Sequence, residues 1–153
     1  MELQEIFNKA HKHFVGMAEP SMGATDYTEA PNMQCAYRGA DGNKCIVGAF
    51  IPDSLYDESL EGDSLDPMGD YSSSGDFNFH NTRVTDVLAL AFSQKRLTDE
   101  QYILLGSLQR VHDRNAEDWN DGYALNDGVS WYDFIKSEII ACAMKFDLET
   151  DEA

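Results

Sequence analysis

The chain has 153 residues, the length of one ordinary domain, and 42% of them are hydrophobic, which is enough to form a buried core. Its 28 acidic residues outnumber its 11 Lys and Arg residues and give a formal net charge of −17. Affinity for phosphate groups requires Lys and Arg to displace counterions, so this charge argues against direct binding of nucleic acid or of an anionic membrane. We expect a single domain over residues 1–153.

The chain also shows no sign of membrane insertion or secretion. It contains no run of 18 apolar residues, and its acidic N-terminus is unlike a signal peptide. The three Cys residues are an odd number, which suits a reducing compartment better than a disulfide framework. These features predict a cytoplasmic protein, and they give no indication of its oligomeric state.

The first predicted helix covers residues 2–18, where apolar residues recur with the 3.6-residue period of one helix face. Pro20 and Gly23 are expected to end it, and residues 19–34 are expected to form a loop. His11 and His13 point away from one another on a helix, and we interpret them as exposed. The apolar stripe of this helix consists of Leu3, Ile6, Phe7, Ala10 and Phe14.

Residues 35–51 predict a β-hairpin. Asp41 and Gly42 lie between two runs that contain Tyr, Cys, Ile, Val and Phe, and a glycine can adopt the positive φ of a tight turn. Residues 57–79, rich in Gly, Ser and Asp, follow as a long acidic loop. This loop is either a contact surface or an insertion without a binding role.

Three further helices are predicted in the C-terminal half. Asn81 or Thr82 can cap the first, the Thr98–Gln101 capping-box pattern opens the second, and Ser130 begins the third. Residues 116–129 form a second acidic loop between the last two. The stripes of the three helices are Val84, Val87, Leu88, Ala91 and Phe92; Gln101, Leu104, Leu105, Leu108 and Val111, continuing to His112; and Trp131, Ile135, Ile139, Cys142 and Phe146. The resulting expectation is an α-rich α+β fold of about four helices packed with one β-hairpin.

Cys35 and Cys45 invite a metal or redox interpretation that depends on the hairpin register. A two-residue turn places them on opposite faces, whereas a three-residue turn places them on the same face, where they could bind a metal with His112 or His80. The close Cys-x2-Cys pairs of zinc ribbons are absent from the sequence. We therefore predict no metal site and no cofactor, and we interpret both cysteines as core residues.

His112 and Asp113 are weak catalytic candidates, together with the two thiols. His112 lies at the edge of an apolar stripe and could act as a base towards Cys45 or Cys35. A histidine near a helix C-terminus, stabilised by the helix dipole, is the simpler alternative. No phosphate-binding loop and no His-Glu-x-x-His motif occurs, so the sequence contains no complete catalytic motif.

Arg38 and Lys44 draw attention because bases are scarce in this chain. They lie near each other across the predicted turn and, with Tyr37, could hold a small anionic ligand. The alternative use of these bases is a salt bridge to a neighbouring acidic segment, for instance through Glu61.

Acidic residues gather in two parts of the chain. Residues 53–76 carry eight acids and no Lys or Arg, and residues 117–153 carry ten acids and two bases. Clustered carboxylates can imitate the potential of a phosphate backbone and speed the encounter with a basic groove. The predicted partner-binding residues are Asp57, Glu58, Glu61, Asp63, Asp66, Asp70, Glu117, Asp118 and Asp121.

Several short motifs resemble a group of small uncharacterised proteins of tailed bacteriophages and prophages. The motifs are Cys-x-Tyr-Arg-Gly-x-x-Gly-x-Lys-Cys-x-Val-Gly at 35–48, Ile-Pro-Asp-x-x-Tyr at 51–56, Glu-Gly at 61–62 and Leu-Gln-x-x-His-Asp at 108–113. The resemblance extends from the first helix to Trp119, and the acidic segments 63–79 and 117–128 depart from it. It implies the bacterial cytoplasm during infection as the compartment, and no mechanism.

Charge and resemblance together predict a phage accessory protein without enzymatic activity. Its acidic surface would bind a host protein, such as a basic nucleic-acid-binding component of host defence, as an inhibitor or nucleic-acid mimic. The alternative is a small anionic-ligand binder, or a Cys/His enzyme, centred on residues 35–48.

Overall fold

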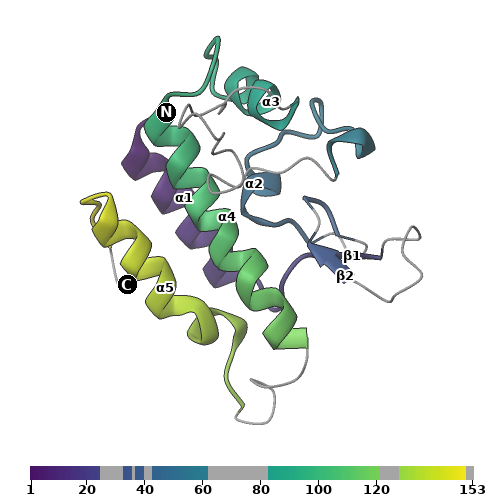
Figure 1. Cartoon of the computed structure of the whole chain (residues 1–153), viewed down its shortest axis with the longest axis vertical. Coiled ribbons are helices and arrows are strands. Elements are labelled where there is room, and N and C mark those ends of the chain that lie inside the picture. The colour runs from purple at the N-terminus through teal and green to yellow at the C-terminus, as the bar shows by residue number, and fades with distance from the viewer. Residues whose placement is uncertain (25–32, 36, 40–42, 62–82, 121–127, 151–153) are drawn as a thin grey trace, which may run out of the picture.

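The computed structural model is built mainly from helices (Figure 1). It describes residues 1–24, 33–35, 37–39, 43–61, 83–120 and 128–150. Within these ranges the α-helices are α1 (Leu3–Gly16), α2 (Ile46–Ala49), α3 (Arg83–Ala91), α4 (Asp99–Asn120) and α5 (Trp131–Lys145). A single 3-10 turn, η1 (Glu58–Leu60), and two short strands, β1 (Met22–Ala24) and β2 (Met33–Cys35), complete the described elements.

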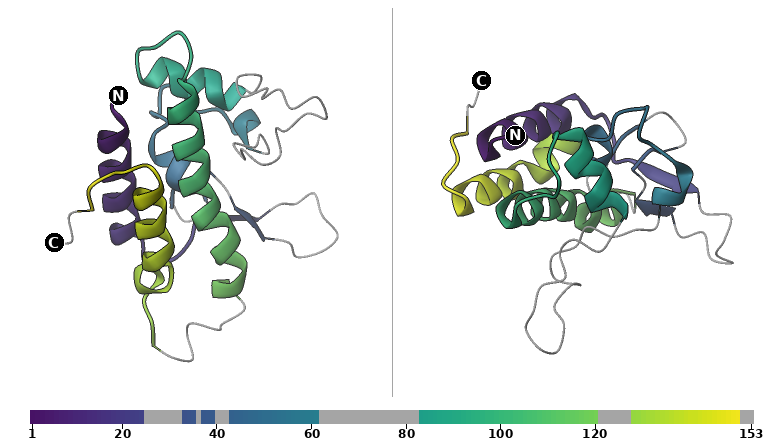
Figure 2. Two further views of the ribbon diagram at one scale, coloured as in Figure 1. Left: turned by 60° about the vertical axis from the view of Figure 1, so that its left-hand side comes forward. Right: turned by 90° about the horizontal axis from the view of Figure 1, so that it is seen from above.

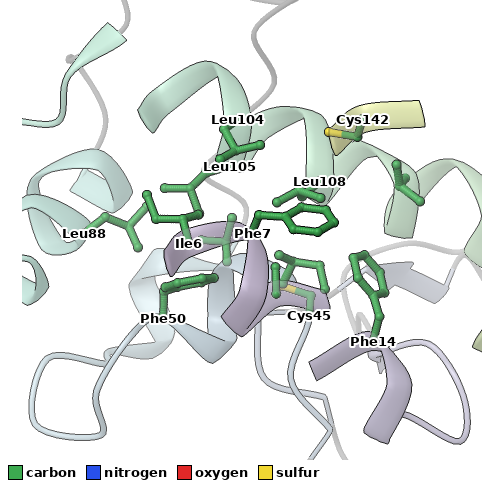
Figure 3. Packing of buried hydrophobic residues seen from close by; sticks show 14 of the residues in the cluster. Ile6, Phe7, Phe14, Cys45, Phe50, Leu88, Leu104, Leu105, Leu108 and Cys142 are labelled. Carbon is green, nitrogen blue, oxygen red and sulfur yellow. The ribbon is translucent and has the colours of Figure 1, made fainter. Parts of the chain in front are cut away.

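The core lies where α1, α4 and α5 meet. These three helices contact one another pairwise, and α2 packs against both α1 and α4 (Figures 1 and 2). Most positions of the predicted stripes of α1, α4 and α5 are buried in this core, and those labelled in Figure 3 point into it. The buried side chains shown there include Ile6, Phe7, Phe14, Cys45, Phe50, Leu88, Leu104, Leu105, Leu108 and Cys142. The predicted stripe of α3 is confirmed only in part, because Val84 and Leu88 are buried whereas Val87, Ala91 and Phe92 are half-buried.

The predicted helix starts are confirmed at α4 and α5. The Thr98 hydroxyl accepts the Gln101 N–H, and the Gln101 side chain accepts the Thr98 N–H, as a capping box requires. Ser130 Oγ accepts the Asp133 N–H at 3.1 Å and caps α5. At α1 the four fully buried residues are Ile6, Phe7, Ala10 and Phe14, which confirms the predicted stripe apart from the half-buried Leu3.

Helix α4 continues to Asn120, so the prediction of a loop beginning at residue 116 is wrong at its N-terminal end. Ala116 and Trp119 are buried and extend the apolar stripe of α4 by two turns. Trp119 packs edge-on against Trp131 of α5, with ring centroids 5.6 Å apart. This contact between distant residues stabilises helical turns that the local acidic, Asn-containing sequence does not favour.

The β-hairpin predicted for residues 35–51 is wrong. The chain does turn back, because Arg38 bridges to Lys44 and the Gly39 N–H donates to the Asn43 carbonyl at 2.7 Å. Pairing then stops at Cys45, and the expected second strand is instead the short helix α2. The turn residues 40–42, including Asp41 and Gly42, lie outside the described residues.

Two hydrogen bonds, one local and one from α4, explain why α2 is a helix despite its β-branched residues. Cys45 Sγ accepts the Gly48 N–H at 3.4 Å, and Gln109 Oε1 of α4 accepts the Val47 N–H at 2.9 Å. Helix N-termini leave such N–H groups without intrahelical partners, so these two acceptors stabilise the first turn. The strand propensity of Ile46 and Val47 depends strongly on context, and here the capping hydrogen bonds outweigh it.

The observed strands lie elsewhere, partly in the segment predicted as a loop. β1 and β2 pair antiparallel, with Met22 opposite Cys35 and Ala24 opposite Met33. This ribbon of two three-residue strands does not form a sheet layer. The fold is therefore helical, and the expected α+β class with a packed hairpin is wrong. Among the described helices, none combines the length and the apolar character needed to cross a bilayer.

Candidate functional site

A partly buried hydrogen-bond network, which reaches the surface at Asp113, joins the middle of α4 to α2 and to the start of the ribbon. Gln109 Nε2 donates to Asp113 Oδ1 at 2.6 Å, while its Oε1 accepts the Val47 N–H. His112 Nδ1 lies 2.9 Å from the same Asp113 oxygen, and His112 Nε2 accepts the Ser21 N–H at 2.9 Å. The catalytic candidates His112 and Asp113 are thus brought together, but within a structural network.

The partners of His112 define its tautomer. Because a backbone N–H can only donate, the Nε2 atom that faces Ser21 carries no proton, and the proton sits on Nδ1, facing Asp113. The ring is completely buried and packs edge-on against Trp131. A proton taken up at Nε2 would break the Ser21 hydrogen bond, so this nitrogen is poorly placed to act as a general base.

The Cys45 thiol is buried in the hydrophobic core. It is 1% exposed, and burial raises its pKa far above the ordinary thiol value, with the Asp113 and Glu61 charges acting in the same direction. Burial also raises the pKa of Cys142 to about 11. Figure 3 shows the two thiols on different sides of the core. Cys35 lies in β2, but its side chain is outside the described part of the structure.

We expect Cys45 to resist alkylation in the folded protein. At about pH 8, iodoacetamide should modify Cys45 at least about a hundredfold more slowly in the folded protein than in the unfolded chain. In the folded protein little thiolate forms, and the sulfur is buried. Peptide mass spectrometry of native and denatured samples measures the ratio. Rapid native labelling of Cys45 would show that it is accessible and reactive.

The raised pKa of Cys45 also links stability to pH. The folded state holds the thiol proton more tightly than the unfolded chain, so the stability it contributes is complete below about pH 8.5. That contribution decreases as the pH rises above the ordinary thiol value towards the higher folded value.

Arg38 and Tyr37, two of the predicted ligand residues, make contacts within the fold. Arg38 forms a 2.7 Å ion pair with Asp53, donates to the Ile51 carbonyl at 3.0 Å and stacks over the Tyr56 ring at 4.3 Å. Tyr37 is buried. Arg38 therefore forms the salt bridge to a neighbouring acid that was the alternative to ligand binding, but the acid is Asp53 rather than Glu61.

Glu61 is occupied within the fold. Its carboxylate accepts the N–H groups of Tyr37 and Arg38, at 2.9 and 3.2 Å, and the Tyr56 hydroxyl at 2.6 Å. Burial and then Glu61 raise the pKa of the Tyr56 hydroxyl. Glu61 therefore connects the motifs at 35–48, 51–56 and 61–62, and this connection gives those motifs a folding role.

The other predicted partner-binding acids are only partly described. Asp57, Glu58 and Asp118 are exposed, and Asp57 caps η1 by accepting the Ser59 N–H. That hydrogen bond lowers the pKa of the Asp57 carboxyl. Glu117 belongs to α4, but its side chain is not described. Asp63, Asp66, Asp70 and Asp121 lie outside the described residues.

A groove lined by basic residues lies between α1 and the segment that leads into α2. Its volume is about 590 Å³. Lys44, predicted as a ligand residue, lines this groove, whereas Tyr37 and Arg38 are absent from its lining. The lining residues are Lys9, Lys12, His13, Gly16, Met17, Asn43, Lys44 and Ala49.

The sequence interpretation missed most of these residues. Lys9, Lys12, His13 and Gly16 recur at helical spacing, so a positively charged stripe on α1 was visible beside the apolar one. The prediction that His11 and His13 are exposed is wrong, since both are half-buried. His11 Nε2 lies 2.7 Å from the Tyr132 hydroxyl, and His13 Nε2 lies 2.6 Å from the Lys44 carbonyl. Nothing in the sequence marked Ser21 as the backbone donor to His112.

Comparisons with protein-family models, curated proteins and solved structures found no match. Within the described residues, no group of three or more His, Cys, Asp or Glu side chains is arranged to hold a metal ion. Functional interpretation therefore depends on three features of this chain: the polar network around His112, the acidic segments and the basic groove.

Proposed function

We propose that this chain is a non-enzymatic accessory protein of a bacteriophage that acts in the cytoplasm of the host cell. Its acidic segments bind a basic host protein, such as a nucleic-acid-binding defence component. Complementary charge speeds such an encounter, and clustered carboxylates compete for a groove that otherwise holds phosphates.

The distribution of charge carries this proposal. Residues 53–76 hold eight of the 28 acids and no Lys or Arg, and residues 117–153 hold ten acids and two bases. The rest of the chain is nearly balanced, with ten acids and nine bases. The carboxylate excess is therefore concentrated in two parts of the sequence, as expected if these parts meet a basic partner.

The chemistry of the thiol and imidazole supports a binding role over catalysis. Activated cysteines have lowered pKa values and an adjacent base, whereas burial raises the pKa of Cys45. The Nε2 atom of His112 is occupied by the Ser21 N–H. Neither group is prepared for nucleophilic attack.

A charge-matched pair of variants tests the proposal. Immobilised protein should capture a basic host protein from bacterial lysate at about 50 mM NaCl and release it at about 500 mM, because screening weakens contacts between exposed charges. Duplex DNA should also elute the captured protein if the acidic segments occupy a nucleic-acid groove. The triple variant Asp63→Asn, Asp66→Asn, Asp70→Asn should lose most of this capture.

The control removes three exposed acids from α3 and the start of α4, through Asp86→Asn, Asp99→Asn and Glu100→Gln. It changes the net charge by the same amount and should retain capture. Equal loss in both variants would mean that only net charge matters. An empty low-salt lane with the unmodified protein would contradict the proposal.

A further inference from the structure

The basic groove is built on one face of α1. Lys9, His13 and Gly16 follow one another at helical spacing, and Asn43 and Lys44 approach from the segment before α2. Helix α2, which follows that segment, packs against α1 and so holds the two walls of the groove together. At about 590 Å³ the groove has the size of a small-molecule site.

Positive charge gathers here on a chain that is strongly acidic overall. Three of its 11 Lys and Arg residues line the groove, and among the described lining residues none is Asp or Glu. Within the described part of the chain, the one carboxylate at ion-pair distance from these ammonium groups is Asp53, 3.9 Å from Lys44 Nζ. Lys9 Nζ lies over the Phe50 ring at 4.7 Å. Glu19 contacts the groove through Asn43, whose Nδ2 donates to the Glu19 carboxylate at 3.3 Å. Three ammonium groups beside these two carboxylates still give the concave surface a more positive potential than the rest of this acidic chain.

The pKa of His13 is sensitive to the lysine charges in this groove. The Nε2 atom of His13 faces the Lys44 carbonyl, so that nitrogen carries the proton of the neutral ring. Burial is the main reason that the pKa of His13 is lowered, and His112 of α4, Lys44 and Lys9 add to the effect, while the Lys44 carbonyl opposes it. An anion in the groove would offset the lysine charges.

We propose that the groove formed by Lys9, Lys12, His13 and Lys44 binds a small anion that bears several phosphate groups. Three ammonium groups complement a ligand with several negative charges better than they complement a ligand with a single carboxylate. Lysine is also a common phosphate ligand. A long nucleic acid does not fit, because the surrounding acidic surface would repel it. This site is separate from the acidic segments of the proposed function and is tested independently of them.

Titration of the full chain with inorganic triphosphate tests the site, using two-dimensional NMR to detect binding. Shifts should be confined to residues 9–17 and 43–49, and the pKa of His13 should rise when triphosphate is bound. The double variant Lys12→Gln, Lys44→Gln should weaken binding by about tenfold or more, since hydrogen bonds to charged groups are among the stronger ones. Parallel titrations with adenosine 5′-monophosphate and adenosine 5′-triphosphate distinguish a nucleotide from inorganic phosphate as the source of these groups.

Lys95→Gln is the control, because Lys95 is exposed and is not among the described residues that line the groove. It should change triphosphate affinity by no more than about twofold. Equal weakening by Lys95→Gln and by the double variant would overturn the proposal, as would the absence of binding at about 10 mM triphosphate. An unchanged pKa of His13 in the presence of bound triphosphate would also overturn it, even if a variant failed to fold.

Discussion

Replacing Gly48 with alanine is expected to lower the free energy of unfolding by about 3 kcal/mol or more. A Cβ atom at this position would lie 1.9 Å from the Tyr37 carbonyl oxygen and 2.7 Å from its carbon. Both are backbone atoms, so no side-chain rotation relieves the clash. The segment of Tyr37 and Arg38 would have to move away from α2 and from Glu61. Urea unfolding followed by tryptophan fluorescence measures the loss.

Gly16 provides the matched control for this substitution. It is the last residue of α1, and a Cβ atom there would meet nothing within 4 Å. Alanine is the better helix former by about 1 kcal/mol, so Gly16→Ala should be neutral or slightly stabilising. A Gly48→Ala protein as stable as the unmodified one would contradict the close approach of α2 to Tyr37.

Glu61→Ala is expected to destabilise the protein by about 2–3 kcal/mol. The substitution leaves the N–H groups of Tyr37 and Arg38 and the Tyr56 hydroxyl without their acceptor. Hydrogen bonds to a charged group contribute more than neutral ones, but the site is only half-buried and solvent screening reduces each contribution. Thermal and urea denaturation measure the effect.

Glu58→Ala is the control, since Glu58 is exposed in the same acidic segment. Its effect should stay within about 0.5 kcal/mol, as for most surface substitutions. If the two variants were equally stable, Glu61 would be a surface residue available to a partner, as the sequence interpretation assumed. If Glu61→Ala alone is destabilised, its carboxylate belongs to the fold.

Local rules were sufficient for the main helices. The apolar stripes of α1, α4 and α5 and the caps at Thr98 and Ser130 involve residues three or four positions apart, so the sequence displays them directly. The same reasoning failed at residues 46–49. There, the acceptor for the Val47 N–H is Gln109, 62 residues away, and no local pattern could reveal it.

Aromatic packing decided the length of α4 for a similar reason. The sequence predicts a loop from residue 116, yet Trp119 meets Trp131 and Phe134 of α5. Burial of that indole stabilises helical turns whose intrinsic propensity is low. As a result His112 lies in the interior of a helix rather than near its end, and its expected interaction with a helix terminus is absent.

The candidate sites also differ in whether local sequence or tertiary contacts determine them. Charge is a sum over residues, so the acidic excess, its concentration in a few segments and the argument against nucleic-acid binding followed from sequence alone. The basic groove required the fold, because Lys9 and Lys12 approach Lys44 only when α1 packs beside α2. Likewise, the availability of Cys45 and His112 for chemistry depends on burial and on hydrogen-bond partners from other elements. Those properties arise from contacts between residues far apart in the chain, which a local pattern does not encode.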